Sequence, residues 1–226
     1  MADTMAFVVE ECIILASYGK RTWLPFLAAL MLGGIVSGIF LPWLCIPFGA
    51  ALAFVLWFFR DPERKTPAAD NALISPADGK IVEIAAIEEG EHIGGPALKI
   101  AIFMSVFDVH VNRSPSCATV EWIRHLPGQF MNAIRSNAGI ENEHTLVALR
   151  DERSRPLLLN LVAGLVARRI VCALKPGETL GRGERLGMIK FGSRVEVFVP
   201  RSEEFHVSAR LGQHVKAGRT VLGEWM

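Results

Sequence analysis

The chain carries one long apolar stretch near its N-terminus. Residues 23–59 include no Asp, Glu, Lys, Arg or His. As one helix this stretch would reach about 55 Å, whereas the hydrocarbon core of a bilayer is about 30 Å thick. Pro42 and Pro47 lie near its middle and interrupt a helix, because proline lacks the N–H and fixes φ. The pattern predicts two apolar helices, 23–41 and 42–59, forming a spanning or re-entrant membrane hairpin, with a buried helical hairpin as the alternative.

The charges that flank this stretch predict its orientation. Lys20 and Arg21 precede it, three basic residues follow it within 60–65, and the turn between the helices is uncharged. Because positive charge is retained on the cytoplasmic side, we expect both ends of the hairpin there. Residues 1–65 are therefore predicted to anchor the protein at the cytoplasmic face of the cell membrane.

The pattern changes after the apolar stretch. Alternating or β-branched apolar residues predict strands at 80–84, 98–103 and 194–199, and turn dipeptides such as Asp78-Gly79 separate such segments. Helix is predicted only near 129–136, and near 7–18 in the N-terminal part. The fold class predicted for 66–226 is a β-rich α+β domain of barrel-sandwich-like hairpins, preceded by the N-terminal hydrophobic helical hairpin.

Two segments of this domain resemble each other. Residues 174–181 and 215–223 share an apolar-Lys-x-Gly-x-Thr-apolar pattern, which is typical of the hairpins of lipoyl carrier domains. A carrier presents its modified lysine at the tip of a tight turn, whereas Lys175 and Lys216 each precede the turn. The pattern therefore indicates turn chemistry, and a noncatalytic barrel-like binding module remains one alternative function.

Composition narrows the function classes. With 24 basic and 23 acidic residues the net charge is +1, which excludes nucleic-acid binding driven by bulk electrostatics. The four cysteines, Cys12, Cys45, Cys117 and Cys172, show neither the paired spacing of a zinc site nor the density of a disulfide scaffold. We expect reduced, structural thiols and no metal site.

Three short segments combine reactive side chains with turn residues: 75–79, 107–113 and 190–194. They contain Asp78, His110 and Ser193, and a carboxylate can orient a histidine that removes a proton from a hydroxyl. This set is compatible with a membrane-tethered serine hydrolase, although Ser193 lacks the Gly-x-Ser-x-Gly pattern of such enzymes. Asp78 as a turn residue and His110 as a core residue are the structural alternatives.

The pair Gly192-Ser193, just before a predicted strand, favours another reaction. The serine hydroxyl can attack the preceding carbonyl carbon, and glycine permits the strained backbone that brings the two atoms together. The resulting ester can then eliminate to dehydroalanine, which hydrolyses to a pyruvoyl group at the new N-terminus. The pattern thus predicts self-cleavage that creates a ketone.

These motifs together resemble the short bacterial and archaeal form of the phosphatidylserine decarboxylase family, over essentially the whole chain. The segments that carry the resemblance are Phe59-Arg60-Asp61-Pro62, Ser75-Pro76-Ala77-Asp78-Gly79, Phe107-Asp108-Val109-His110-Val111-Asn112-Arg113, Leu126-Pro127-Gly128, Glu141-Asn142-Glu143 and Phe191-Gly192-Ser193. Each motif is weak alone, but their order and combination are specific.

The resemblance implies a proenzyme that cuts itself between Gly192 and Ser193 into chains 1–192 and 193–226. These chains form a heterodimer, which is free to associate into a larger homo-oligomer. Ser193 becomes the pyruvoyl group, which forms a Schiff base with phosphatidylserine in the membrane and replaces pyridoxal phosphate. Decarboxylation yields phosphatidylethanolamine and CO2 without a metal. Asp78 then supports self-processing and His110 transfers protons.

The sequence departs from the family pattern at two places. Arg113 stands where the long bacterial branch has a second histidine, so His110 alone, or His110 with His144, carries the roles shared there. Phe191 and Arg194 replace the more common Leu and Thr but leave the Gly-Ser pair intact.

Cationic side chains close to these motifs are candidate ligands of the lipid phosphate. Arg113, Lys190 and Arg194 are predicted in this role because of their charge and their positions beside the motifs. Solvated surface charge is the alternative for all three.

Overall fold

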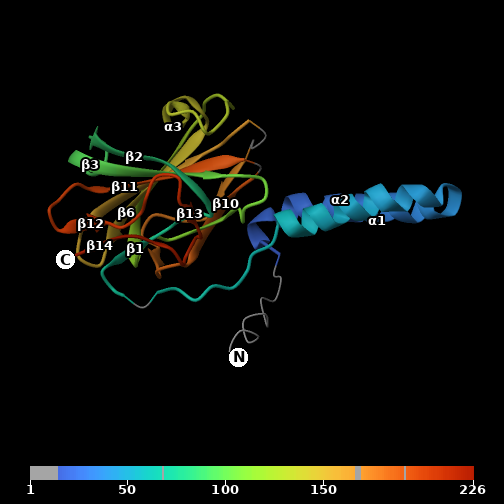
Figure 1. Cartoon of the computed structure of the whole chain (residues 1–226), viewed down its shortest axis with the longest axis horizontal. Helices are drawn as coiled ribbons and strands as arrows, with labels where there is room; N and C mark the ends of the chain where they lie inside the picture. The colour runs from blue at the N-terminus through green and yellow to red at the C-terminus, as the bar shows by residue number, and fades with distance from the viewer. Residues whose placement is uncertain (1–14, 68, 166–168, 191) are drawn as a thin grey trace. The chain divides into compact units, whose positions relative to one another are not determined.

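A computed structural model describes residues 15–67, 69–165, 169–190 and 192–226. The backbone contacts divide the chain into two compact units, Met1–Arg64 and Lys65–Met226. Each unit is built from a different type of secondary structure, as Figure 1 shows. The first is helical and the second consists mainly of strands.

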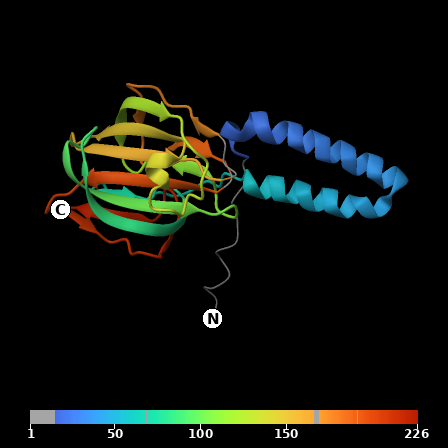
Figure 2. The same ribbon diagram turned by 90° about the horizontal axis from the view of Figure 1, so that it is seen from above.

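The first unit contains two helices connected by a short turn. They are α1 (Lys20–Phe40) and α2 (Cys45–Phe58), with the 3-10 turns Ser17–Gly19 before α1 and Pro42–Leu44 between the helices. The helices run side by side, as Figure 2 shows, and a Cβ at Gly33 would lie 2.6 Å from the ring of Phe48. The predicted interruption at Pro42 is confirmed. Pro47 lies in the first turn of α2, where its missing N–H removes no intrahelical bond.

Only part of the membrane prediction is supported. Among the described residues, one helix, Ser17–Phe40, is long and apolar enough to cross a membrane, and the second apolar helix, Pro42–Phe58, is shorter. Large apolar side chains of both helices, such as Phe40 and Ile46, are exposed. Exposed apolar surface of this kind is typical of contact with lipid or with a partner. The membrane hairpin therefore remains a prediction.

The second unit contains one eight-stranded antiparallel sheet, in the order β13-β2-β3-β11-β7-β6-β5-β9, and two three-stranded sheets, β1-β14-β12 and β4-β10-β8. The strands of the large sheet are β2 (Gly79–Glu89), β3 (Gly95–Met104), β5 (Ala118–Leu126), β6 (His144–Asp151), β7 (Pro156–Val162), β9 (Thr179–Leu180), β11 (Ser193–Pro200) and β13 (His214–Val215). Those of the small sheets are β1 (Ala72–Ile74), β4 (Val111–Arg113), β8 (Ile170–Cys172), β10 (Arg185–Ile189), β12 (Phe205–Val207) and β14 (Val221–Trp225). The three predicted strands are confirmed as β2, β3 and β11.

The large sheet has two faces with different compositions. Along β11, Val195, Val197 and Val199 join the main hydrophobic core, and we call their side of the sheet the inner face. Alternate residues of a strand point to opposite faces, so Arg194 and Phe198 lie on the other side, the outer face. Figure 2 shows the large sheet curving around the inner face. The predicted β-rich domain is therefore present as a strongly curved sheet.

The helix predicted at 129–136 is wrong. The only helix among the described residues of this unit is α3 (Ala138–Glu141), and Gln129 instead forms a parallel bridge with Asn142. The side chain of Asn142 also accepts the backbone N–H of Met131 at 3.0 Å. Side-chain acceptors of this kind compete with helical hydrogen bonds. The helix predicted at 7–18 lies mostly outside the described residues.

The remaining local predictions concern glycine turns and cysteines. Gly177 and Gly218 have φ values of +86° and +73°, a region that favours glycine, as expected from the repeated turn pattern. Cys45, Cys117 and Cys172 are free thiols. Burial raises the pKa of the Cys172 thiol, which keeps it in the protonated form. Cys12 lies outside the described residues.

Candidate active site

Ser193 is the first residue of β11, and its side chain is fully buried on the inner face. In the sheet register it pairs with Met104, the last residue of β3. The Ser193 hydroxyl donates to the sulfur of Met104, with 3.4 Å between Oγ and Sδ. A thioether is a weak acceptor, so this contact does not hold the hydroxyl in an unreactive strong hydrogen bond.

Gly192 adopts a backbone conformation that few other residues tolerate. Its φ is +69°, in the left-handed region, and a Cβ placed on it would meet no atom within 4 Å. The requirement for glycine at this position is therefore conformational, because the space for a side chain exists. A Cβ at Gly164 would overlap the carbonyl oxygen of Gly192. Two glycines thus permit the path of the backbone immediately before Ser193.

His110 is fully buried and contacts the backbone of Gly192. Its Nδ1 lies 2.8 Å from the carbonyl oxygen of Asp108, and its Nε2 lies 3.4 Å from the backbone nitrogen of Gly192. A carbonyl oxygen only accepts and a backbone N–H only donates, so Nδ1 carries the proton and Nε2 carries a lone pair. The Nε2 lone pair of this histidine is therefore directed at the backbone N–H of Gly192.

A tight turn after β3 positions this histidine. The carboxylate of Asp108 accepts the backbone N–H of Ser105 at 2.8 Å and its hydroxyl at 2.7 Å. Such side-chain acceptors stabilise turns between strands. The Asp108 carbonyl oxygen then orients the imidazole, and the backbone of Ile189 in β10 donates to the carbonyl oxygen of His110.

Asn112 was not predicted as a site residue, although it lies beside Ser193. It is fully buried, its Nδ2 lies 3.7 Å from the sulfur of Met104, and its Oδ1 has no hydrogen-bond partner among the described residues. The sulfur of Met104 therefore accepts hydrogen bonds from the side chains of both Ser193 and Asn112. A signal for Asn112 was present in the sequence. It lies two positions after His110, and in an extended segment residues two positions apart point to the same side.

Asp78 lies in the loop that enters β2. Its Oδ1 accepts the backbone N–H of Ala217 at 2.8 Å, and the residue is buried. The next residue, Gly79, has φ +146°, and a Cβ there would overlap the Phe103 carbonyl oxygen. Since Phe103 immediately precedes Met104, the loop lies at the same end of the large sheet as Ser193.

Two of the three cations predicted to bind phosphate lie next to the motifs in the sequence, since Arg113 ends the segment 107–113 and Lys190 precedes Gly192 by two positions. Arg113 is buried, and its guanidinium donates to the Gly183 carbonyl oxygen at 3.0 Å while its backbone N–H donates to Pro76. Lys190 is also buried. Burial, and to a smaller extent the charge of Arg169, lowers the pKa of Lys190 below its ordinary value. A bound anion would offset the effects of burial and of Arg169 on the pKa of Lys190.

Arg194 lies on the outer face, away from the side chain of Ser193. Its guanidinium donates to Glu196 at 2.8 Å and to Glu83 at 2.5 Å, and Lys99 also pairs with Glu83 at 2.6 Å. The side chain is only 1% exposed. In this arrangement the strong donors of Arg194 are already engaged by carboxylates.

His144 also lies on the outer face. Its Nδ1 donates to the carbonyl oxygen of Asn142 at 2.6 Å, and the residue lines a pocket of about 540 Å³ together with Asn160 and Phe198. The next residue along β6, Thr145, belongs to the opposite face of the sheet. The structure therefore brings His110 to Gly192-Ser193 and places His144 across the sheet from the Ser193 side chain.

Metal-ligating residues are not clustered in the described parts of the chain. There, no group of three or more His, Cys, Asp or Glu side chains is arranged to hold a metal ion. The candidate site contains His110 and the backbone of Gly192 beside Ser193, and Asp78 lies at the same end of the large sheet. Phe191, the remaining predicted departure from the family pattern, lies outside the described residues.

Comparisons with known proteins identify the family of this chain. A family model described as phosphatidylserine decarboxylase matches residues 51–223. The phosphatidylserine decarboxylase proenzyme of Desulfotalea psychrophila is 47% identical over 177 residues, which cover 78% of this chain and 82% of the relative. The proenzyme of Syntrophus aciditrophicus is 40% identical over 209 residues, which cover 92% of this chain and 97% of the relative. The chain belongs to the phosphatidylserine decarboxylase family.

Proposed function

We propose that this protein decarboxylates phosphatidylserine to phosphatidylethanolamine and CO2 after cutting its own backbone between Gly192 and Ser193. The names of its relatives support the reaction and the proenzyme character. The observation that carries the proposal is the contact of the unprotonated His110 Nε2 with the left-handed Gly192, next to a buried serine hydroxyl.

The self-cleavage step uses only groups of this chain. The Ser193 hydroxyl oxygen bonds to the Gly192 carbonyl carbon, the peptide C–N bond breaks, and the Ser193 nitrogen takes up a proton. His110 is suited to accept the hydroxyl proton and to return it, because its Nε2 carries a lone pair and contacts the backbone N–H of Gly192, the residue whose carbonyl carbon is attacked. The weak contact of the hydroxyl with Met104 leaves the nucleophile available.

Elimination of this ester completes the processing. A base removes the α-proton of Ser193, the C–O bond breaks, and Gly192 leaves as the C-terminal carboxylate of the large chain. One water molecule then replaces the nitrogen, which departs as ammonia, so that Ser193 ends as a pyruvoyl group. We assign Asp78 to this processing, because its buried carboxylate lies at the same end of the sheet.

The surroundings of Ser193 fit a pyruvoyl group. The side chain lies on the inner face beside the thioether of Met104, and the Oδ1 of Asn112 is left without a partner. The ketone supplies an electron sink for the electron pair that CO2 leaves behind. His110 then holds a proton at Nε2 and delivers it to the former α-carbon, while Asn112 offers an acceptor for a substrate N–H.

The apolar helices of the first unit support action at a membrane. A diacyl substrate remains in the bilayer, so an enzyme anchored there meets it without extracting it. We propose that α1 and α2 anchor the protein at the cytoplasmic face of the cell membrane, and that chains 1–192 and 193–226 remain together as a heterodimer. β11 supports the heterodimer, since it lies between β3 and β7 in the large sheet.

Intact mass under denaturing conditions tests the proposal. We expect two chains, 1–192 and a 34-residue chain 193–226, the latter lighter by one ammonia than a serine-started peptide. The Ser193→Ala protein, which lacks the nucleophile, serves as the uncut control. A single folded chain that reacts with serine-directed acylating reagents supports the hydrolase instead, and one that does not react supports the binding module.

Conversion of phosphatidylserine in vesicles then tests the substrate. Release of CO2 from the carboxyl carbon by the cut protein, and none by the Ser193→Ala protein, is the expected result. A cut protein that leaves phosphatidylserine unchanged would contradict the substrate but keep the self-cleavage.

A further inference from the structure

A polar cavity lies away from the Gly192-Ser193 site. It has a volume of about 190 Å³ and is lined by residues from the β6–β7 turn, the segments before β1 and β5, the 181–184 turn and the end of β14. In β6, His144 pairs with Val162 at the Ser193 end, whereas Arg150 pairs with Pro156 at the other. Asp151, which lines the cavity, follows Arg150, so about one strand length, roughly 20 Å, separates the two sites.

Two buried polar atoms of the cavity lining have no partner among the described residues. They are the Nε of Arg182 and the hydroxyl oxygen of Ser116. The side chain of Arg182 is 10% exposed and Ser116 is 7% exposed. A buried donor without an acceptor destabilises the folded state, so two of them at one cavity indicate a missing acceptor.

Both terminal nitrogens of the Arg182 guanidinium have partners, which hold the group in place. These nitrogens reach the carbonyl oxygens of Pro67 and Ala69 and, at 3.3 Å, the carboxylate of Asp70. A planar guanidinium fixed in this way presents its remaining Nε–H in one direction. The group is therefore preorganised for one more acceptor.

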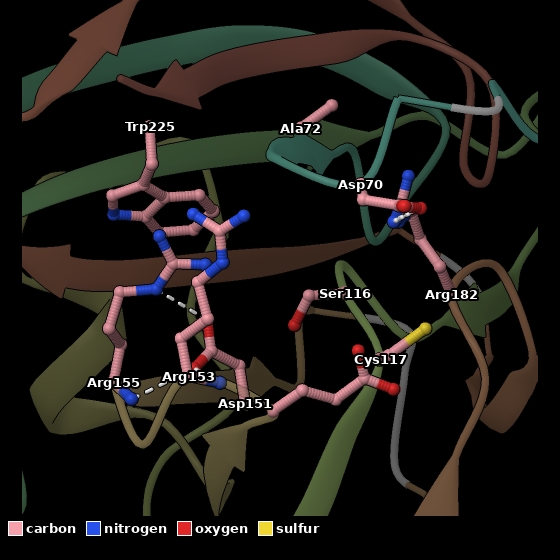
Figure 3. A pocket seen from close by; sticks show the side chains of 10 residues that line it. Asp70, Ala72, Ser116, Cys117, Asp151, Arg153, Arg155, Arg182 and Trp225 are labelled. Atoms are coloured by element: carbon pink, nitrogen blue, oxygen red, sulfur yellow. Dashed lines mark hydrogen bonds and ion pairs between the residues drawn. The ribbon is translucent and has the colours of Figure 1, made fainter.

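The opposite side of the cavity also carries positive charge. Figure 3 shows Arg153, Arg155 and Trp225 on one side, Arg182 and Asp70 on the other, and Ser116 between them. Arg155 pairs with Asp151 at 2.6 Å and stacks on Trp225, with 3.8 Å from its guanidinium carbon to the ring centre.

The carboxylates of the lining are mostly committed to these partners. Asp151 also accepts the backbone N–H groups of Arg153 and Arg155, and Asp70 pairs with Arg182. Glu152 completes the lining, so three arginines face three acidic residues and the formal charge is balanced. Selectivity for an anion then depends on the unused donors rather than on net charge.

We propose that this cavity binds a small phosphate-type oxyanion, either inorganic phosphate or a phosphate monoester. One oxyanion supplies acceptors to the Arg182 Nε–H and the Ser116 hydroxyl together, and Arg153 lies across the cavity to contribute charge. The volume admits a phosphate group but not the acyl chains of a lipid. The site is separate from the decarboxylation chemistry and does not depend on it.

Calorimetric titration of the purified full chain in detergent tests this proposal, with inorganic phosphate and glycerol 3-phosphate as probes and chloride at equal ionic strength as reference. We expect saturable binding of at least one phosphate probe and a matching rise in the unfolding temperature. Tighter binding of glycerol 3-phosphate identifies an ester as the ligand, and tighter binding of inorganic phosphate identifies the free anion.

Two substitutions locate the site. Ser116→Ala should weaken binding about fivefold and Arg182→Lys about tenfold or more, since each removes a donor that the anion uses. Ser202→Ala and Arg201→Lys, exposed and outside the cavity lining, are the matched controls and should leave binding unchanged.

If Arg182→Lys fails to fold, the Ser116→Ala variant alone still tests the proposal. It removes only a hydroxyl without a partner among the described residues, so it is expected to fold. Phosphate that binds no better than chloride, or equally to Ser116→Ala and the parent, would overturn the proposal and leave water as the occupant. Neither readout measures decarboxylation, so failure here and failure of the proposed function are distinguishable.

Discussion

Ser193 and Arg194 are neighbours on one strand and both are buried, but their side chains have different kinds of hydrogen-bond partners on the two faces of the sheet. On the inner face, the Ser193 hydroxyl has a thioether as its acceptor. On the outer face, the Arg194 guanidinium is held by the carboxylates of Glu83 and Glu196. A polar group with strong partners stabilises the fold, whereas one with a weak partner remains available for chemistry. The inner face is therefore expected to carry the reactive group, and the outer face to contribute to the stability of the fold.

The largest expected effect concerns the inner face. His110→Gln removes the basic nitrogen but retains a polar side chain, and we expect self-cleavage to slow by about 10²- to 10⁴-fold, the usual contribution of a general base. Appearance of the 34-residue chain with time, followed by mass, measures the rate. His144→Gln on the outer face is the matched control and should cleave normally. Slowing by His144→Gln would contradict the assignment of faces and return His144 to the site.

The backbone next to Ser193 offers a second test of the inner face. Gly164→Ala places a methyl group where the Gly192 carbonyl oxygen lies, so the scissile peptide must move. A displacement of about 1 Å can cost about 100-fold in rate, and we expect a loss of that order in self-cleavage. Gly90→Ala, where a Cβ meets nothing within 4 Å, is the control. Equal cleavage of both variants would show that the position of this carbonyl is unimportant.

The outer face should respond in stability rather than in rate. Arg194→Met leaves Glu83 and Glu196 without their shared partner, and removing one member of a buried ion-pair network costs about 3–5 kcal/mol. Urea unfolding in the Ser193→Ala background measures this free energy without interference from cleavage.

An exposed pair provides the reference for that measurement. Arg124→Met breaks an ion pair with Glu91 at 2.8 Å and should cost about 0–1 kcal/mol. If Arg194→Met costs no more than this, the network is not stabilising. A raised KM of the cut Arg194→Met enzyme, with unchanged stability, would instead support contact with the lipid phosphate.

The smallest expected effect is a pH dependence from Glu83. Burial by itself raises the pKa of Glu83, but hydrogen bonds and charge from Lys99 and Arg194 outweigh it and hold the pKa below its ordinary value. The folded state then binds fewer protons than the unfolded state between the two pKa values. The stabilisation is therefore complete above the ordinary pKa and is lost as the pH falls through the lower, folded pKa.

Urea unfolding of Glu83→Gln at several pH values checks this sign. We expect the variant to be less stable than the parent near neutral pH and to lose less stability on acidification. Parallel curves for the two proteins would show that Glu83 does not contribute to the acid sensitivity.

Much of the fold was predictable because the signals are local. Strands β2, β3 and β11 follow from alternation over a few residues, and the interruption at Pro42 follows from the geometry of proline. The helix predicted at 129–136 failed because side-chain acceptors, such as that of Asn142, replaced the helical hydrogen bonds of this segment. Such competition depends on residues that only the folded chain brings near.

The candidate site was predictable in its residue types but not in its contacts. Asp78, His110, Gly192 and Ser193 are recognisable from their motifs, whereas the contact of His110 with Gly192 joins residues 82 positions apart. Asn112 was missed, although it lies two residues after His110, because its contact with Met104 depends on how β3 and β4 are brought together.

The sequence by itself determined that Ser193 and Arg194 point to opposite faces, since side chains alternate along any strand. The Gly192-Ser193 pair by itself also predicted an unusual backbone before the serine, and the φ of +69° at Gly192 agrees with that prediction. Only the tertiary structure decided which face contains the core, that His110 reaches the Gly-Ser peptide while His144 lies across the sheet, and that Gly164 makes room for a carbonyl oxygen. These features depend on strand order and register, which follow from packing the whole apolar set at once rather than from any local segment.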